Sequence, residues 1–544
     1  MSDKQKKIRL PAPLYDTTNQ YLRRKITRRE FLARTAAMGL SLPALGALIS
    51  ACTVPTPEAI EVEKIVTVEV EKAAALPTSS MLAAEQVAKE KYAGETLNIS
   101  WESGLQAQDP IIFSGPEFEK RTGVKINVIE NGRQLELFTK QLTEHTAGTG
   151  ALDILSVQPT WVADYVFAGV IAPLDDLIAE YMNPDDMEDY PDIFKDMGMF
   201  EGTRYGLFDD GDLLLLYYRT DLFEEHGDEF ADKLGYPLAP PANWKEFDEV
   251  ARFFTEKLAP DMYGAGFARG SKWNWQVFQP HYKANGGRWF DPDTMEPLIN
   301  GPEGVRTVSE MKASNQWMPP GAEQLAGPDA FNEWLAGGYA MTWFWPPLGR
   351  WSAGYGQQTA QMAFVPESTV VGKTGYALFP GDITQHAAGY VMSVASDSPR
   401  TELAYLFLQW LTSPEISLQR VMLPYALRDP YRISHFESTL YRNMWAEAGN
   451  YLDKLMEAGN KASLDIFLPG AAEYHDILDR ACTAAYAGTE PQEALDTAAQ
   501  EFEDLTERMG RDRQKQAYAA YLQMGGAYPS TNLVDAPSNL ELYE

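Results

Sequence analysis

The sequence predicts an α/β protein with at least two domains, on two observations. Its 544 residues exceed what a single hydrophobic core normally organises. From residue 96 onward, short apolar segments alternate with segments of helical periodicity, which is typical of a parallel sheet covered by helices on both faces. Ligands of such sheets lie beyond the carboxyl ends of the strands, so the residues that follow each strand are the first candidates for a site.

The first elements follow this alternation from residue 96 to residue 168. We expect strands at 96–101, 124–129 and 152–157, and helices at 116–121, 135–146 and 162–168. The first and third strands then end at Trp101 and Glu102 and at Gln158 and Trp161, and we take these four residues as candidate ligand contacts.

The stretch 207–218, LFDDGDLLLLYY, runs from acidic residues into four leucines and two tyrosines. The apolar run predicts a strand buried on both faces. Asp209, Asp210 and Asp212 stand where this strand begins, and both a solvated turn and a ligand contact remain open for them. A calcium loop is disfavoured, because no glutamate follows at the spacing that such a loop requires.

The composition excludes several classes of protein. There are 46 basic and 77 acidic residues, for a net charge of −31, which disfavours binding to nucleic acid. The two cysteines, Cys52 and Cys482, cannot build a disulfide framework or a cysteine-based metal site. No two of the six histidines have helical ligand spacing. We therefore predict neither a metal site nor a cofactor.

The first 52 residues resemble an export signal. Arg28 and Arg29 precede a short apolar run at 36–50, as in a twin-arginine signal, and the run ends at Cys52 as in a bacterial lipobox. The run contains proline and is shorter than the roughly 20 apolar residues that a transmembrane helix needs. The resemblance implies that Cys52 is lipidated and that the protein stands on the outer face of the cell membrane or in the periplasm. We expect an extended tether at 53–94, and we take Cys482 as a small core residue.

Six segments in order resemble the extracellular solute-binding proteins of ATP-driven importers, the family that includes maltose-binding protein. They lie at 153–178, 205–227, 241–257, 330–345, 387–415 and 487–505. The resemblance implies the two-lobed periplasmic-binding-protein fold of class II type, a ligand in the cleft between the lobes, and no catalysis. On this chain, lobe one would comprise 95–212 and 388–428, lobe two 213–387 and 429–525, and a C-terminal tail 526–544.

Aromatic residues supply the candidate ligand surface. Nine of the thirteen tryptophans fall between Trp244 and Trp351, in the expected second lobe. Aromatic rings cover the apolar faces of a sugar, and charged and amide side chains bond its hydroxyl groups. The candidate ligand contacts are Trp273, Trp275 and Trp345 from lobe two, with Trp101, Glu102, Gln158, Trp161, Asp210, Asp212, Tyr425 and Arg428.

Each of these residues has a structural alternative. A tryptophan is usually a core residue, and Arg428 could equally form an ion pair between the lobes. In the stretch AMTWFWPP at 340–347, strand alternation places Met341, Trp343 and Trp345 on one face. The family resemblance implies that Trp343 belongs to the end of the core, which leaves Trp345, before two prolines, as the candidate platform.

The predicted function is solute binding for an importer. A monomeric, lipid-anchored protein would close its two lobes on a mono- or oligosaccharide and deliver it to a membrane permease. The alternatives are a binding protein for a polyamine or an organic anion, and a secreted carbohydrate-active enzyme.

Overall fold

A computed structural model of the chain describes residues 77–543, apart from 133–134, 382–383, 387–388 and 525–536. Arg28, Arg29, Cys52 and most of the expected tether lie outside the described residues. Within the described part, no helix is both long enough and apolar enough to cross a membrane.

The first lobe is built on a five-stranded sheet in the order β2-β1-β3-β12-β6. The strands are β1 (Thr96–Glu102), β2 (Lys125–Asn131), β3 (Ile154–Val157), β6 (Leu207–Phe208) and β12 (Val391–Val394). β1 pairs in parallel with β2 and β3, whereas β12 runs antiparallel to β3 and β6. The sheet is therefore mixed, which corrects the expectation of a wholly parallel one. The antiparallel strand β12 comes from a segment that returns to this lobe more than 180 residues after β6.

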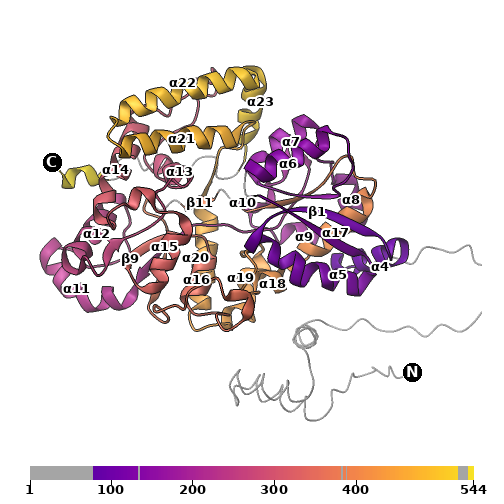
Figure 1. Cartoon of the computed structure of the whole chain (residues 1–544), viewed down its shortest axis with the longest axis horizontal. Coiled ribbons are helices and arrows are strands. Elements are labelled where there is room, and N and C mark those ends of the chain that lie inside the picture. Colours follow the sequence, from indigo (N-terminus) through magenta and orange to yellow (C-terminus); the bar gives the residue numbers. More distant parts are fainter. Residues whose placement is uncertain (1–76, 133–134, 382–383, 387–388, 525–536, 544) are drawn as a thin grey trace, which may run out of the picture. The chain divides into compact units, whose positions relative to one another are not determined.

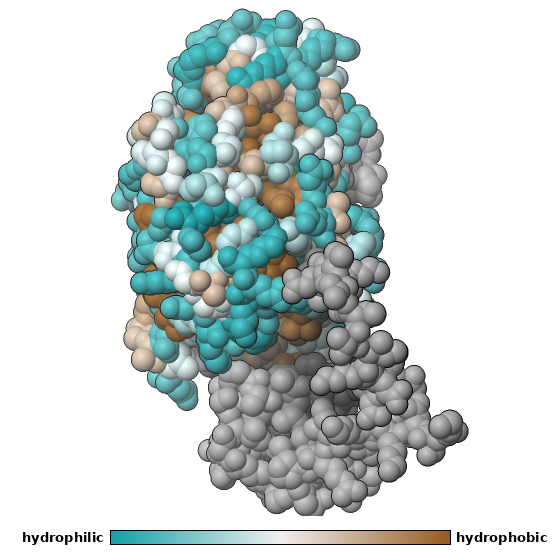
Figure 2. All heavy atoms as spheres, turned by 90° about the vertical axis from the view of Figure 1, so that its right-hand side faces the viewer, coloured by the Kyte–Doolittle hydropathy of each residue, from teal (hydrophilic) through white to brown (hydrophobic). Residues whose placement is uncertain are grey.

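Helices cover both faces of this sheet. Figure 1 shows α6 and α7 on one side of β1 and α4, α5 and α17 on the other. The helices of this lobe are α4 (Ser80–Tyr92), α5 (Gly115–Thr122), α6 (Leu135–Thr146), α7 (Val162–Ala168), α8 (Asp175–Tyr181), α9 (Asp185–Glu188), α10 (Asp192–Lys195), α17 (Thr401–Thr412) and α18 (Pro414–Val421). The bounds predicted for α6 and α7 are confirmed. Seen from outside, the surface of this side is mainly hydrophilic, with hydrophobic residues in separate small areas (Figure 2).

Helix α4 corrects the prediction of an extended tether up to residue 94. It packs against α17 and α5 and buries Ala84, Val87 and Ala88 in the core of the first lobe. Ser79 caps the helix by accepting a hydrogen bond from the amide of Leu82 (3.4 Å). The sequence reading failed here because lysines and glutamates alternate with small apolar residues, so the helical face is narrow.

The second lobe is built on a four-stranded sheet in the order β10-β7-β9-β8. The strands are β7 (Leu215–Arg219), β8 (Tyr263–Ala265), β9 (Tyr339–Phe344) and β10 (Thr374–Ala377). β7 is antiparallel to β9 and β10, and β8 is parallel to β9. The helices before residue 353 are α11 (Thr220–Leu234), α12 (Trp244–Leu258), α13 (Asn274–Ala284), α14 (Pro302–Ser314), α15 (Gly327–Ala336) and α16 (Pro347–Ser352).

The chain passes from the first sheet to the second between β6 and β7. The buried strand predicted from the apolar run after Asp212 corresponds to β7, which begins at Leu215, and residues 209–212 before it form the crossing between the two sheets. At the crossing, Gly211 lies so close to the segment at 429–431 that an added Cβ would sit 2.0 Å from the carbonyl oxygen of Pro430. Only glycine permits this approach.

The C-terminal part is helical and packs mainly on the second lobe. It comprises α19 (Ile433–Glu437), α20 (Ala448–Lys461), α21 (Ala471–Tyr486), α22 (Pro491–Met509) and α23 (Arg511–Tyr521), with β13 (Ala462–Leu464) paired in parallel with β11 (Thr384–His386). Cys482 is fully buried in α21. Part of the expected C-terminal tail is docked on the second lobe, because Asn539 is fully buried and donates a hydrogen bond to Asp248 in α12 (2.8 Å).

Candidate functional site

Five of the predicted site residues meet in one buried polar cluster, which includes the crossing at 209–212. Arg428 is at its centre and is fully buried. Its Nε donates to Asp209 (2.8 Å) and its Nη1 to Asp210 (3.2 Å). The guanidinium lies over the ring of Trp101, with Cζ 4.9 Å from the ring centroid. The geometry therefore places Arg428 in a buried ion-pair network at the crossing, with both of its aspartate partners in the segment assigned to lobe one.

Glu102 joins the same cluster at the end of β1. It is 3% exposed and accepts a hydrogen bond from the hydroxyl of Tyr390. Burial, followed by the charge of Glu102, raises the pKa of Tyr390. The guanidinium of Arg428 also lies over the Tyr390 ring, 5.2 Å from its centroid. These contacts join β1 and the segment before β12, so Glu102 acts within the first lobe.

Three carboxylates form the other end of the cluster. Oxygen atoms of Asp210, Asp212 and Asp429 lie within 4.8 Å of one another. Burial raises the pKa of Asp210. Burial, and after it the like charges of Asp210 and Asp429, raises the pKa of Asp212. Burial raises the pKa of Asp429 to about 6. Arg350 pairs with Asp429 (3.1 Å), so positive charge is already supplied there by protein side chains. Protonated members of this cluster can donate hydrogen bonds as well as accept them.

A second buried arginine extends the network to the loop after β1. The side chain of Arg420, in α18, is fully buried and pairs with both Asp109 (2.6 Å) and Asp209. Sequence reasoning missed Asp109, Arg350, Arg420 and Asp429. No local pattern signals these four residues, because their partners are distant along the chain.

In the second lobe, the three predicted tryptophans take part in two separate aromatic pairs, Trp273 with Trp345 and Trp275 with His475. Trp273 and Trp345 are both half-buried, with ring centroids 5.8 Å apart in an edge-to-face arrangement. Trp345 follows β9 directly, whereas Trp343 within β9 is 2% exposed. Trp275 stacks on His475 at 3.9 Å, and His475 in turn contacts Asp465 (3.0 Å).

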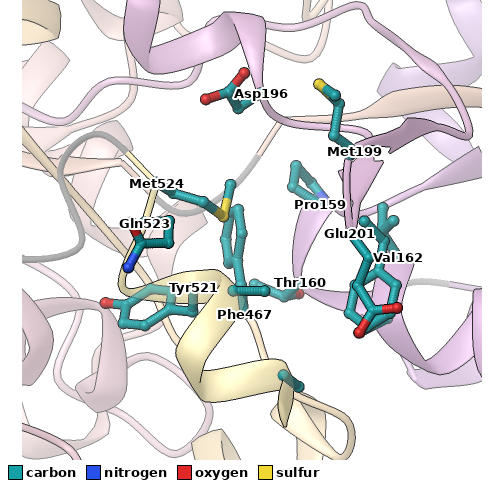
Figure 3. Close-up of a pocket in the computed structure, with 15 residues that line it drawn as sticks. Pro159, Thr160, Val162, Asp196, Met199, Glu201, Phe467, Tyr521, Gln523 and Met524 are labelled. Atoms are coloured by element: carbon teal, nitrogen blue, oxygen red, sulfur yellow. The ribbon is translucent and has the colours of Figure 1, made fainter.

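Residues of both lobes line a pocket of about 340 Å³. Figure 3 shows Pro159, Met199 and Glu201 of the first lobe on one side, and Tyr521 and Met524 on the other. Most of the lining is apolar, and the volume lies at the lower end of the range of roughly 300–1,000 Å³ that small ligands occupy. The lining therefore suits a small molecule with an apolar face.

Two polar side chains at or behind the pocket wall, Thr160 and Lys283, differ in whether their hydrogen bonds are satisfied. The hydroxyl of Thr160 is buried without a hydrogen-bond partner among the described residues. Behind Tyr521, the amine of Lys283 donates to the Tyr521 hydroxyl (2.9 Å), and burial lowers the pKa of Lys283 to about 7. Thr160 is thus a donor or acceptor that a bound molecule could satisfy.

The predicted residues Gln158, Tyr425, Trp101 and Trp161 are not among those that line this pocket. Gln158 is half-buried next to the pocket residue Pro159, and Tyr425 is half-buried three residues before Arg428. Trp101 is 0% and Trp161 2% exposed, so in this structure neither has a free ring face for a sugar. That role is corrected for both, because Arg428 covers Trp101 and the rings of Phe138 and Tyr165 pack against Trp161.

Comparison with known proteins defines the class. The model of the bacterial extracellular solute-binding protein family matches residues 100–417, and the chain belongs to this family. The two α/β lobes and their crossing segments agree with the match. The family consists of extracellular solute-binding proteins, and the related structures include a solute-binding protein of an ABC transporter.

Two relatives of known sequence are named for the sugar alcohols that they bind. The chain is 25% identical over 279 residues to a mannitol-binding protein of Pseudomonas aeruginosa, a match to 48% of this chain and 57% of that protein. It is 23% identical to an erythritol/L-threitol-binding protein of Mycolicibacterium smegmatis, over 67% of this chain and 76% of that one. The chain thus spans little more than half the length of the first of these relatives.

Solved structures share the fold. A solute-binding protein from Agrobacterium radiobacter K84 in complex with ribitol superimposes with a TM-score of 0.63 at 24% identity, covering 76% of this chain and 99% of that one. Maltose-bound MalE3 of T. maritima gives a TM-score of 0.62 at 19% identity, covering 75% and 99%. The two-lobed periplasmic-binding-protein fold predicted from the sequence is confirmed.

Proposed function

We propose that this protein captures a sugar or sugar alcohol outside the cell by closure of its two lobes and delivers it to the permease of an ATP-driven importer. The observation that carries the proposal is the pocket that both lobes line, with half-buried tryptophans in the second lobe. A ligand held from both sides stabilises the closed arrangement over the open one.

The chemistry of the region fits an uncharged, hydroxyl-rich ligand. Asp196 and Glu201 are the charged residues among those that line the pocket, and both are acidic, which disfavours an organic anion. The relatives named for mannitol and for erythritol or L-threitol support the same class of ligand.

The remaining parts of the proposal concern anchoring and assembly. Arg28, Arg29 and Cys52 give the chain the pattern of a twin-arginine-exported lipoprotein, which would hold a monomer at the outer face of the membrane. The protein would bind and release its ligand without chemical change. Mass spectrometry of the membrane-extracted protein tests the anchor, since an N-terminal diacylated Cys52 is expected.

A thermal-shift panel tests the ligand class. The panel contains ribitol, mannitol, maltose, putrescine and citrate, with tryptophan fluorescence as a second signal. A ligand at about 100 times its Kd stabilises the native state by about 2.7 kcal/mol, so a bound sugar must raise the melting temperature. A shift with putrescine or citrate alone would refute the proposal, and chromatographic detection of a product would instead support an enzyme.

A pair of variants then tests the tryptophan assignment. Trp345→Ala is expected to weaken binding of whichever sugar shifts the melting temperature, with a small change in stability. Trp343→Ala serves as the matched comparison, because removing a buried tryptophan costs about 3–5 kcal/mol of stability. Equal losses of stability in the two variants would contradict the assignment of Trp345 as the platform.

A further inference from the structure

The helix α21 lacks a capping side chain of its own. Its N-cap residue is Gly470, in the left-handed conformation with φ 83°, and a glycine cannot provide the oxygen that usually accepts from the first amides of a helix. The helix has 16 residues, so its N-terminus carries a substantial partial positive charge. The amide of Gly470 itself is buried, so it needs an acceptor from elsewhere in the molecule.

Asp164 of the opposite lobe provides this acceptor. Asp164 lies in α7, which follows β3 of the first sheet, whereas α21 packs on α13 of the second lobe. Both carboxylate oxygens of Asp164 accept from the amide of Gly470, at 3.1 and 3.0 Å. Arg513 and Glu473 are the charged side chains that act on Asp164 from α23 and α21. The contact therefore joins the two lobes.

We propose that Asp164 is a latch residue, which caps α21 only when the two lobes are together and so sets the lifetime of the closed, ligand-bound form. The inference rests on the proposed function, because it takes closure of the lobes as the binding event. Asp164 is a positioning residue in this scheme and need not touch the ligand.

Two further contacts across the same boundary support the inference. On α23, Gln516 donates to the carboxylate of Glu201, and the guanidinium carbon of Arg513 lies 3.6 Å from the centroid of the Phe167 ring. Phe167 belongs to α7, the helix that carries Asp164. The C-terminal helices thus contact the first lobe beside the pocket, and an opening of the lobes must break all of these contacts together.

The latch is connected to the aromatic pair of the second lobe. Residue His475 lies in the second turn of α21, where its ring stacks on Trp275. When the start of α21 is held by its cap, the position of the stacked pair His475 and Trp275 is fixed as well. Loss of the cap is therefore expected to loosen the second-lobe side of the site as well as the contact between lobes.

The charge state of Asp164 suggests a matched pair of variants. Burial raises the pKa of Asp164 to about 7, so the contact does not require a permanent negative charge. Asp164→Asn keeps an oxygen that can accept from Gly470, and it is expected to retain most of the latch. Asp164→Ala removes the acceptor. Asp176→Ala, at an exposed position of α8 in the same lobe, is the control.

The first measurement needs no ligand. Fluorescent labels are placed in the full chain at Cys substitutions of Lys120 in α5 and Lys233 in α11, with Cys52 replaced by serine. Single-molecule energy transfer then reports the distance between the lobes. Asp164→Ala is expected to shift the distribution to longer distances relative to the parent chain, while the control does not. An unchanged distribution would overturn the latch, whatever the ligand proves to be.

The second measurement uses the sugar or polyol that shifts the melting temperature, with ribitol and mannitol tested first. The dissociation rate is expected to rise about 10-fold or more in Asp164→Ala, with less than about a 2-fold change in the association rate, because the cap forms only after closure. Asp164→Asn is expected to lie near the parent. A lower melting temperature of the unliganded chain with unchanged rates would show a merely structural role. If no sugar binds the parent, the proposed function fails, and the distance measurement still decides the latch.

Discussion

Replacing Arg420 by methionine tests whether the buried ion-pair network holds the first lobe and the crossing together. The side chain of Arg420 is 0% exposed, and its Nε and Nη2 contact the same oxygen of Asp109 at 2.7 and 2.6 Å. Its guanidinium also pairs with both oxygens of Asp209. Methionine fills a similar volume, so the substitution removes the charge and five hydrogen-bond donors with little change in packing.

The magnitude follows from what the substitution leaves behind. Removal of one partner of a buried ion pair typically costs about 3–5 kcal/mol, because the other charge remains in a medium of low polarity. Arg420 pairs with two carboxylates. After the substitution, Asp209 still pairs with Arg428 at 2.8 Å, whereas Asp109 has lost its arginine partner. We therefore expect a loss near the upper end, about 5 kcal/mol at pH 7.

Urea-induced unfolding followed by tryptophan fluorescence measures this loss. The control is Lys140→Met, which removes an exposed pair with Glu144 in α6 and is expected to change stability by less than about 0.5 kcal/mol. A loss for Arg420→Met of less than about 1 kcal/mol would refute the reasoning, since it would mean that the buried carboxylates are solvated as well as the exposed ones.

Three further changes test the docked C-terminal segment and the crossing. Asn539→Ala is expected to cost about 1–3 kcal/mol in thermal unfolding, because it leaves the buried acceptors of Asp248 and Glu310 with one donor fewer. Burial raises the pKa of Asp248 to about 7 against about 3.9 for an unfolded aspartate, so its stabilising contribution is complete below about pH 4 and is lost as the pH rises through about 7. Asp248→Asn should flatten that part of the stability–pH curve, and an unchanged slope would contradict the assignment. Gly211→Ala forces a Cβ against the carbonyl of Pro430 and is expected to lower the free energy of unfolding in urea by about 1–3 kcal/mol. An unchanged free energy of unfolding would show that the two segments at the crossing move apart to make room.

Local patterns predicted much of the first lobe. Helices α6 and α7 have the predicted bounds, because an amphipathic period defines each, and Gly169 ends α7 in the left-handed conformation with φ 71°. The apolar run after Asp212 predicted a buried strand, and β7 begins within it at Leu215. The run did not indicate where the strand starts, because Leu213 and Leu214 are as deeply buried as the residues of β7.

Only part of the candidate site was predicted. Trp101 and Glu102 were found because the sheet rule points to them, and the aspartates after β6 because they stand before a buried apolar run. The partners that decide their roles were not found, since Arg420 and Asp209 are 211 positions apart in the chain. The faces of Trp101 and Trp161 are likewise covered by residues that no local pattern places there. Long-range pairing thus decides which candidates can face a ligand.

The docking of α4 has a mechanical consequence. Ser80–Tyr92 pack on α5 and α17, all of them within the first lobe. A pull on the chain from its N-terminal side would therefore be borne by the first lobe, while the second lobe would carry none of the load. Tension would not bias the swing of one lobe relative to the other. The length and stiffness of whatever precedes Ser80 should accordingly be free to vary without altering the affinity for the ligand.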